Sequence, residues 1–572
     1  MTKEIISSHI FVFPFRWDVG KDEHCLDACI NNRLNVEKFI KYLKEDNQWE
    51  EDKIVSNIIK NKEVENDLNY NAYVYFYDNV RKAIYGKEDY IKKNKNISVN
   101  IKNSKYYVGK LFSKKVSNTI VKCFNYKCID DKSTYEIYMY KKNDKGEIYI
   151  DKRKNPYKLK IKSIKLKVYD TGVATLSYFL NNHEWKDKED ILRINDYGRR
   201  IYPQHIPLDS VRSNFLAKKL SLKLKNRIIE EDFDYEIKEK PTKISKTIIN
   251  ILGEKFVSTE KELRCKYKSL SKEETIFVKP VIDDRMFVIC YYNNDFFSRV
   301  LTKYDKDEYL KNDFWYQFLF VDNGGATCKD EEMKKELLLK STYARWKDYG
   351  TLFGISRYSF VILCDESEFS RDVLYNHINI IYYEMILLAL VQRASILRFS
   401  DETSRIASFE RKNIYEQIKK LQEYYIRFVN TIYFREVTAQ EQGIELYDKI
   451  MELMRIDTEV KRLDEEIDEI QRYVNLETND RTNRLLNVVT FVGIGVSVIS
   501  LISSVFSNNK QIGNLTWLAI WQYIPFVIVL LVISVIKKYV NNNKVMKIIM
   551  WVITLVAIYI VLDYKFIKLF IK

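Results

Sequence analysis

Two short segments combine arginine and glycine with an aromatic residue in a way that suits the binding of an anion. Residues 195–200 read NDYGRR, and residues 350–357 read GTLFGISR. An arginine fork can donate two hydrogen bonds to one phosphate, a glycine lets the backbone approach closely, and an aromatic face can stack on a base. A turn with solvated arginines is the alternative. The candidate ligand contacts are Tyr197, Arg199, Arg200, Gly350, Ser356, Arg357 and Arg393.

A second set of polar residues follows one helix face inside an uncharged segment. No residue from 485 to 506 is charged, and this length can cross a hydrocarbon core of ~30 Å as a helix. Polar atoms are costly in lipid, so this face should meet another helix or water. The alternatives are helix packing and the lining of a pore, in which Ile494 and Leu501 would gate by dewetting. The candidate pore-lining residues are Asn483, Asn487, Thr490, Ile494, Ser497, Leu501, Ser504 and Asn508.

Two more apolar segments follow the first one. Residues 517–536 predict a second membrane span, and residues 545–562 predict a third, shorter one. Arg484 before the first span and the pair Lys537–Lys538 after the second favour the cytoplasmic side. A third span would place the lysines after residue 564 outside, so an interfacial or re-entrant helix is the alternative there. We therefore expect a multi-pass protein of the inner membrane with its large N-terminal domain in the cytoplasm.

The elements that must position these residues divide the chain into five parts. The patterns predict an α+β or α/β cytoplasmic domain, then a helical hairpin, a long stalk helix and C-terminal transmembrane helices. The expected parts are an N-terminal α/β domain (1–245), a second, strand-rich part of the cytoplasmic sensor (246–370), paired helices (371–435), the stalk helix (436–484) and the transmembrane region (485–572).

Individual elements follow from the period of the apolar residues. Strands are expected at residues 10–15, 71–76, 157–168, 285–292 and 359–364, and the run 157–168 predicts either a strand pair or one bulged strand. Residues 374–399 are very apolar, but their polar side chains predict a buried helix, in which Arg393 would form an ion pair or contact a ligand. A charged helix is expected at 406–433. Residues 444–506 lack proline and predict one rod of roughly 90 Å with an apolar seam at 453–474.

Composition narrows the function further. The net charge of +15 arises from 94 basic and 79 acidic residues, which predicts a mixed surface rather than a nucleic-acid-binding stripe. Five histidines in no recognised motif, and the lack of a phosphate-binding glycine loop, lead us to expect no enzyme and no cofactor, with a divalent cation left open. His24, Cys25, Cys29, Cys123 and Cys128 are candidate zinc ligands, although the spacing is loose and reduced thiols are the alternative.

The order of these parts resembles the CorA superfamily of divalent-cation channels. The resemblance rests on the stalk at 446–475, the junction NRLLNVVT at 483–490 and the pair Lys537–Lys538 after the second span. It implies a homo-oligomer, in that superfamily a pentamer, whose first span lines the pore. The Gly-Met-Asn motif that holds hydrated Mg²⁺ in that superfamily is absent, because residues 507–514 read SNNKQIGN.

Two phrases, YGTLFGISRYS at 349–359 and QRAS at 392–395, resemble CorA-like effectors found beside type III CRISPR systems. This resemblance implies a channel opened by a nucleotide second messenger, in one branch S-adenosylmethionine joined to AMP, that permeabilises the membrane in antiviral defence. The implied partners are further copies of the chain, the lipid bilayer and the nucleotide, with no direct contact to nucleic acid. The alternatives are a divergent Mg²⁺ transporter and a non-conducting membrane-anchored scaffold.

Overall fold

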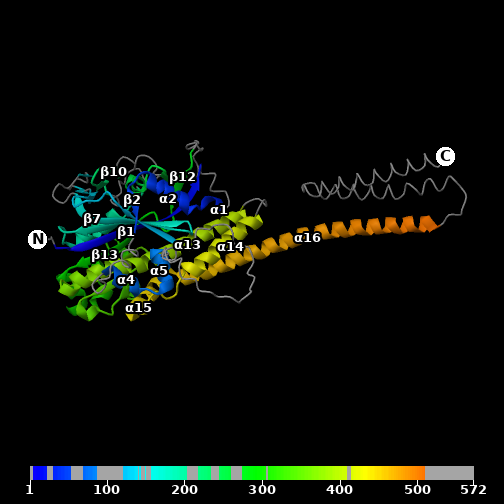
Figure 1. Cartoon of the computed structure of the whole chain (residues 1–572). Helices are drawn as coiled ribbons and strands as arrows, with labels where there is room; N and C mark the ends of the chain where they lie inside the picture. The colour runs from blue at the N-terminus through cyan, green and yellow to red at the C-terminus, as the bar shows by residue number, and fades with distance from the viewer. Residues whose placement is uncertain are drawn as a thin grey trace, which may run out of the picture. The chain divides into compact units, whose positions relative to one another are not determined.

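The computed structural model divides into two compact units, Met1–Asp468 and Glu469–Lys572. The described residues are 4–21, 30–52, 68–86, 120–139, 141–142, 148–149, 156–202, 217–233, 244–258, 273–304, 307–408 and 414–508 (Figure 1). The expected second and third spans at 517–536 and 545–562 lie outside the described residues.

The first unit is built on one mixed sheet of 14 strands, with the path β10-β9-β4-β7-β8-β1-β13-β16-β15-β14. The strands are β1 (Ser7–Gly20), β2 (Trp49–Glu51), β3 (Val121–Tyr126), β4 (Thr134–Tyr138), β5 (Lys141–Lys142), β6 (Ile148–Tyr149), β7 (Tyr157–Tyr169), β8 (Val173–Asn182), β9 (Lys219–Lys223), β10 (Ile228–Asp232), β11 (Phe256–Ser258), β12 (Thr275–Pro280), β13 (Phe287–Asn293), β14 (Thr342–Tyr343), β15 (Leu352–Ile355) and β16 (Ser359–Cys364). Since β1 pairs with β12 and β13, the expected parts 1–245 and 246–370 share one sheet.

Helices cover the sheet, and the chain after the last strand is mainly helical in the part that the structure describes. The α-helices are α1 (Ile30–Arg33), α2 (Val36–Glu45), α4 (Leu68–Tyr75), α5 (Asp78–Tyr85), α6 (Lys188–Gly198), α8 (Lys246–Leu252), α9 (Asp295–Arg299), α10 (Asp313–Phe320), α11 (Glu331–Ser341), α12 (Tyr375–His377), α13 (Tyr383–Ser408), α14 (Ile414–Thr431), α15 (Glu441–Met454) and α16 (Ile456–Asn508). Shorter 3-10 or π-helical turns are η3 (Val300–Tyr304), η4 (Glu308–Leu310), η5 (Lys347–Tyr349), η6 (Ser370–Leu374) and η7 (Ile378–Tyr382).

Strand β1 lies at the centre of the sheet and is buried along its whole length. Successive side chains of a strand point to opposite faces. On one face His9 contacts Asn195 of α6, and on the other Asp18 contacts Arg398 of α13. Helices therefore cover both faces of the central strand, which explains its continuous run of apolar residues.

The strands expected at 10–15, 157–168 and 359–364 are confirmed as parts of β1, β7 and β16, and the strand expected at 285–292 is confirmed from Phe287 onward as β13. The register of β7 against β8 shifts between Ile161 and Ser163, so the run is one bulged strand rather than a pair. Pro14, which lacks an N–H, lies between the end of the pairing with β13 and the start of the pairing with β12. At this position no hydrogen bond of the sheet is lost because proline has no N–H to donate.

The strand expected at 71–76 is wrong, because this segment belongs to α4 and the turn after it. Its aromatic and β-branched residues favour a strand only where a pleated surface covers them. Here the helix is held by tertiary contacts instead. Thr438 Oγ1 donates to the carbonyl of Tyr75, and a Cβ at Gly443 would overlap the hydroxyl of Tyr75. Packing therefore overrides local preference at this segment.

Residues Ser370–Ala407 form one long apolar helical stretch, composed of η6, α12, η7 and α13. Among the residues whose side chains the structure describes, this is the one helix long and apolar enough to cross a membrane, but 83% of its most apolar part is buried inside the fold. Helix α13 packs on β1 and β8 and against α14 and α15. The expected buried helix at 374–399 is therefore confirmed, and a helix buried in this way is weak evidence of a membrane span.

The prediction of one unbroken helix at 444–506 is wrong, because the helix is interrupted at a single residue. Helix α15 ends at Met454, Arg455 adopts a left-handed backbone with φ of 57°, and α16 begins directly after it. A left-handed residue other than glycine costs about 1–2 kcal/mol, so nothing in the local sequence predicts this break. Beyond the break, α16 includes the whole expected first span at 485–506, and at about 1.5 Å per residue it is about 80 Å long.

The apolar seam at the start of α16 packs inside a single chain. Val460, Leu463 and Ile467 are at most 5% exposed. Tyr425 of α14 donates a hydrogen bond to the carboxylate of Asp464 next to this seam. The apolar seam at the start of α16 therefore packs against helices of the same subunit.

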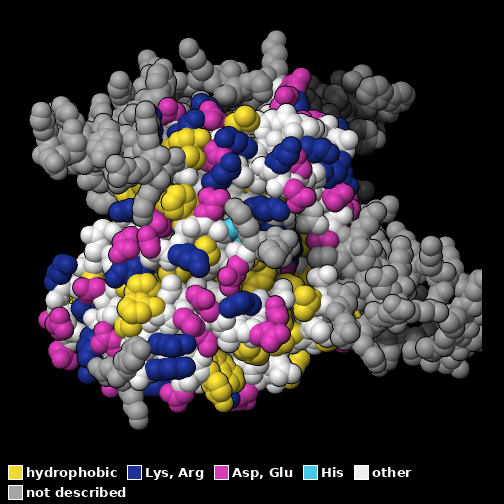
Figure 2. Space-filling model, turned by 90° about the vertical axis from the view of Figure 1, so that its left-hand side faces the viewer, with side chains coloured by type: hydrophobic (Ala, Val, Ile, Leu, Met, Phe, Trp, Pro, Cys, Tyr) yellow, Lys and Arg dark blue, Asp and Glu magenta, His cyan; other side chains and the backbone are white. Residues whose placement is uncertain are grey.

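The surface of the described part mixes both signs of charge. Figure 2 shows basic and acidic side chains interleaved across the face in view, with apolar side chains between them. The same mixture follows from the 94 basic and 79 acidic residues of the chain.

Candidate functional site

The end of helix α6 places the arginines of the first candidate segment around one carboxylate. Oδ1 of Asp196 accepts hydrogen bonds from Nη2 of Arg200 at 2.9 Å and from Nη2 of Arg199 at 3.3 Å. Oδ2 of Asp196 accepts from the amide of Asn323 at 3.0 Å. Tyr197, between them in the sequence, is buried. Two buried arginines share one aspartate, which leaves an excess of positive charge.

Arg199 has donors to spare. Arg199 is 2% exposed, and its Nε and Nη1 have no hydrogen-bond partner among the described residues. Burial is the main cause that lowers the pKa of Arg199 to about 10, with repulsion from Arg285 and Arg200 adding to it against the attraction of Asp196. A buried donor without an acceptor costs free energy. Arg199 is therefore the one predicted contact with buried, unused capacity for an anion.

A third arginine joins the two candidate segments. Arg200 forms an isolated β-bridge with Arg285, and the N–H of Met286 donates to the carbonyl of Arg199 at 2.7 Å. The Arg285 guanidinium lies 5.4 Å from the centre of the Tyr358 ring. Since Tyr358 follows Arg357 in the turn between β15 and β16, the segments 195–200 and 356–358 meet through Arg285.

The turn between β15 and β16 carries Arg357 to the end of helix α15. Nε of Arg357 donates to the carbonyl of Leu453 at 3.3 Å, and Nη1 of Arg393 donates to the carbonyl of Arg357 at 3.1 Å. Among the described residues neither arginine has an ion pair. Burial first, and then the nearby Arg357, lowers the pKa of Arg393. The buried ion pair expected for Arg393 is replaced by a bond to a main-chain carbonyl.

The other two residues of the second segment have structural roles. Oγ of Ser356 lies 2.7 Å from Oγ of Ser359 and accepts from the N–H of Tyr358 at 3.2 Å, which shapes the turn. Gly350 lies before the opposite end of β15, where its φ is 80° and its carbonyl accepts from Ser298 at 2.7 Å. A Cβ there would approach Ser298 Oγ to 2.7 Å. The structure does not bring Gly350 to the arginines.

We call the five arginines of this region, with Tyr358, the arginine cluster. Its members are Arg199, Arg200, Arg285, Arg357, Arg393 and Tyr358. Sequence reasoning missed Arg285 and Tyr358. The available signal was DDR at 283–285, an arginine directly before a strongly apolar strand.

The polar face of α16 is described in part. Asn483, Asn487, Thr490 and Ser497 are exposed in the single chain. The hydroxyls of Thr490 and Ser497 each donate at 2.8 Å to the carbonyl four residues earlier in the helix. These internal bonds reduce the cost of placing the hydroxyls in lipid, while the two asparagines lack such a bond among those described. For Ile494, Leu501, Ser504 and Asn508 only the helical backbone is described.

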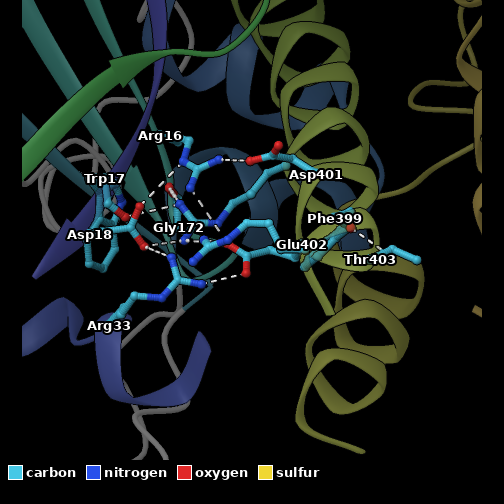
Figure 3. Close-up of polar contacts among 11 residues, drawn as sticks. Arg16, Trp17, Asp18, Arg33, Gly172, Phe399, Asp401, Glu402 and Thr403 are labelled. Atoms are coloured by element: carbon cyan, nitrogen blue, oxygen red, sulfur yellow. Dashed lines mark hydrogen bonds and ion pairs between the residues drawn. The ribbon is translucent and has the colours of Figure 1, made fainter. Parts of the chain in front are cut away.

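Among the residues that the structure describes, a buried cluster of five or more charged side chains lies away from the candidate site and was not predicted. Figure 3 shows it between β1, α1 and α13. Oδ1 of Asp18 lies 2.6 Å from Nη1 of Arg33 and 2.7 Å from Nη2 of Arg398, and Arg33 also reaches Glu402 at 2.5 Å. Burial opposes ionisation of Asp18, but Arg398, Arg33 and Arg16 together lower its pKa to about 2. This cluster ties α13 to the sheet through charge.

A histidine, a cysteine and an asparagine meet in the core without being poised for catalysis. Nδ1 of His9 lies 2.7 Å from Oδ1 of Asn195 and 3.5 Å from Sγ of Cys290. Both His9 and Cys290 are fully buried. Burial lowers the pKa of His9 to about 4 and raises the pKa of Cys290 to about 12. A nucleophile needs a thiolate and access, so this group serves packing.

Within the described residues, no group of three or more His, Cys, Asp or Glu is arranged to hold a metal ion. Of the candidate zinc ligands, His24, Cys25 and Cys29 lie outside the described residues. Burial raises the pKa of Cys123 to about 11, which disfavours the thiolate that zinc requires.

The comparisons with known proteins assign no family. No family profile matches the chain, and no curated protein matches it.

Proposed function

We propose that the chain is a homo-oligomeric membrane channel whose cytoplasmic domain binds an anionic, nucleotide-like messenger that controls opening. One observation carries the proposal. The arginine cluster ends at the carbonyl of Leu453, three residues before the first residue of α16, and α16 continues to Asn508 through the uncharged segment 485–506. A ligand bound at the cluster would act directly on the helix that enters the membrane.

The chemistry of the cluster favours a phosphate-bearing ligand with a ring. Arg199 has two unused donors, and Arg357 and Arg393 donate to carbonyls rather than to carboxylates. Such donors are available to a stronger acceptor, and charge-assisted bonds to phosphate are stronger than bonds to neutral carbonyls. Tyr358, which is 37% exposed beside Arg285, offers an aromatic face for a base.

The resemblance to CorA-like effectors extends the proposal. It adds a pentameric assembly in the inner membrane, a messenger such as S-adenosylmethionine joined to AMP, and a role in antiviral defence by membrane permeabilisation. The polar face of α16 would line the pore.

Flux from liposomes tests the proposal. The purified full chain should be silent alone and should release an encapsulated ion when S-adenosylmethionine joined to AMP is added. Arg199→Ala should weaken the response by about 10-fold or more, because a charged hydrogen bond contributes about 1.5–3 kcal/mol. The matched control is Arg299→Ala, an exposed arginine paired with Asp295 on α9. Steady Mg²⁺ flux without nucleotide, equal in all variants, would establish a transporter instead.

A further inference from the structure

The break between α15 and α16 lacks the usual sequence causes. The residues around it, MELMRIDTEV at 451–460, contain neither glycine nor proline, yet Arg455 holds a left-handed backbone that favours glycine. The Arg455 N–H donates at 3.0 Å to the carbonyl of Glu452, which closes α15. A continuous helix is the conformation that this sequence prefers, so contacts from outside the segment must favour the break.

Arg357 supplies such a contact. In a continuous helix the carbonyl of Leu453 would accept the N–H of Asp457, four residues later. In this structure that carbonyl accepts from Nε of Arg357 at 3.3 Å. The last carbonyls of a helix need partners from outside the helix. Arg357 therefore caps α15 and occupies the acceptor that a continuous helix would use.

Helix α15 itself is firmly held. Its Leu446, Tyr447 and Ile450 are at most 1% exposed, and the Tyr447 hydroxyl accepts from the side chain of Gln392 in α13 at 2.9 Å. A change at the break would therefore fall on the first turn of α16 rather than on α15.

We propose that Arg357 is a switch residue of the arginine cluster. An anion bound at the cluster draws the Arg357 guanidinium away from Leu453, the freed carbonyl accepts the N–H of Asp457, and α15 and α16 join into one helix. Ligand capture rests on the proposed function, whereas the competition between Arg357 and Asp457 for one carbonyl rests on the geometry of the break.

The experiment measures the distance between spin labels at the exposed positions 448 and 465, introduced through unnatural amino acids. The full chain is placed in nanodiscs and diluted with unlabelled subunits. A continuous helix fixes the separation of these Cα atoms at about 26 Å, from about 1.5 Å per residue. Arg357→Ala should raise the ratio of joined to broken helix roughly tenfold without ligand, because the cap is lost.

Proline at 457 provides the matched control. It is tolerated in the first turn of α16 but has no N–H for Leu453 and clashes with that carbonyl in a continuous helix. Asp457→Pro should hold the broken form even when combined with Arg357→Ala. Asp457→Ala also loses the bond from the Tyr433 hydroxyl but keeps its own N–H. In this variant Arg357→Ala should still shift α15 and α16 toward the joined form.

Millimolar pyrophosphate is the probe for anion capture. It should shift the wild type toward the joined form and leave Asp457→Pro unchanged. The proposal is overturned if Arg357→Ala keeps the wild-type distances, if Asp457→Pro still joins, or if pyrophosphate shifts nothing. The switch is tested by a distance, and the proposed function is tested by ion flux. Absence of ion flux would therefore contradict the proposed function and leave the test of the switch unaffected.

Discussion

Asp18 and Arg398 form an ion pair between the central strand of the sheet and helix α13, with Oδ1 of Asp18 2.7 Å from Nη2 of Arg398. Neither side chain is more than 2% exposed. Arg398 also donates to the carbonyls of Trp17 and Gly172, at 3.1 and 2.8 Å. Because α14 and α15 pack on α13, this charge contact anchors the helices that precede α16 to the sheet.

We expect Asp18→Asn to lower the free energy of unfolding by about 3–5 kcal/mol, because it leaves buried Arg33 and Arg398 to share the single carboxylate of Glu402. The matched control is Asp401→Asn, whose side chain is 48% exposed and pairs with Arg16 in the same cluster. It should cost less than about 1 kcal/mol. Denaturant midpoints of the detergent-solubilised chain measure both losses. Equal losses would mean that the cluster stabilises by packing rather than charge.

The buried His9 makes stability depend on pH. Burial lowers its pKa to about 4, and the hydrogen bond that His9 Nδ1 donates to Oδ1 of Asn195 opposes this shift only in part. Between the unfolded pKa near 6.5 and about 4, the unfolded chain binds a proton that the folded chain refuses, so stability falls as pH falls, by up to about 3 kcal/mol. His9→Gln should remove this loss.

The measurement compares the unfolding midpoints of the wild type and His9→Gln at pH 7.5 and pH 4.5. Comparison with the wild type is essential because Asp170, whose pKa burial raises to about 7, contributes the opposite slope. A difference between the two proteins that stays constant with pH would contradict the assignment of this slope to His9.

The position of β7 could be predicted because its apolar residues alternate along most of the strand. The positions of β1, β13 and β16 could be predicted because they are short apolar runs rich in β-branched and aromatic residues. The segment 71–76 could not, since its helix depends on contacts with Thr438 and Gly443, which are distant in sequence. The break at Arg455 is hidden for the same reason, because its cap comes from Arg357.

The candidate site was predicted by residue type and not by arrangement. Arg199, Arg200 and Arg357 were chosen as candidates because arginine near glycine favours anion binding, whereas Gly350, chosen on the same ground, serves a turn. Arg285 joins the two segments through a single β-bridge with Arg200, a relation with no local sequence signature.

The polar face of α16 remains a prediction that cysteine labelling can check. Cysteines at Ser497 and Ser504 should react with a water-soluble thiol reagent when the channel is open. Cysteines at Ile499 and Ile502, on the opposite face, should not react, because lipid or protein covers them. The unmodified chain gives the background from its eight native cysteines. Equal labelling at all four positions would remove the pore assignment.

The start of α16 should matter for folding. Leu463 is 1% exposed within one chain, so Leu463→Asp would bury an unpaired charge at a cost of several kcal/mol. We expect a lower thermal midpoint from this change. Leu476→Asp, at a residue that is 66% exposed, should leave the midpoint unchanged. If only the subunit number in native mass spectrometry changed, the seam would act between chains.

Arg199 separates ligand binding from folding. Arg199→Met should leave the free energy of unfolding within about 1 kcal/mol of the wild type, because it removes a buried charge whose Nε and Nη1 are unpaired. Asp196 keeps its bonds to Arg200 at 2.9 Å and Asn323 at 3.0 Å, so no carboxylate is orphaned. Stability in the absence of ligand therefore has little reason to change.

Ligand stabilisation should respond differently to the same change. At a concentration of 100 Kd a ligand adds about 2.7 kcal/mol to the folded state, and a lost charged hydrogen bond removes about 1.5–3 kcal/mol of its binding free energy. Adding S-adenosylmethionine joined to AMP should raise the thermal midpoint of the wild type and of the control Arg299→Met, and should raise that of Arg199→Met by less than half as much. A full rise in Arg199→Met would place the ligand away from the end of α6.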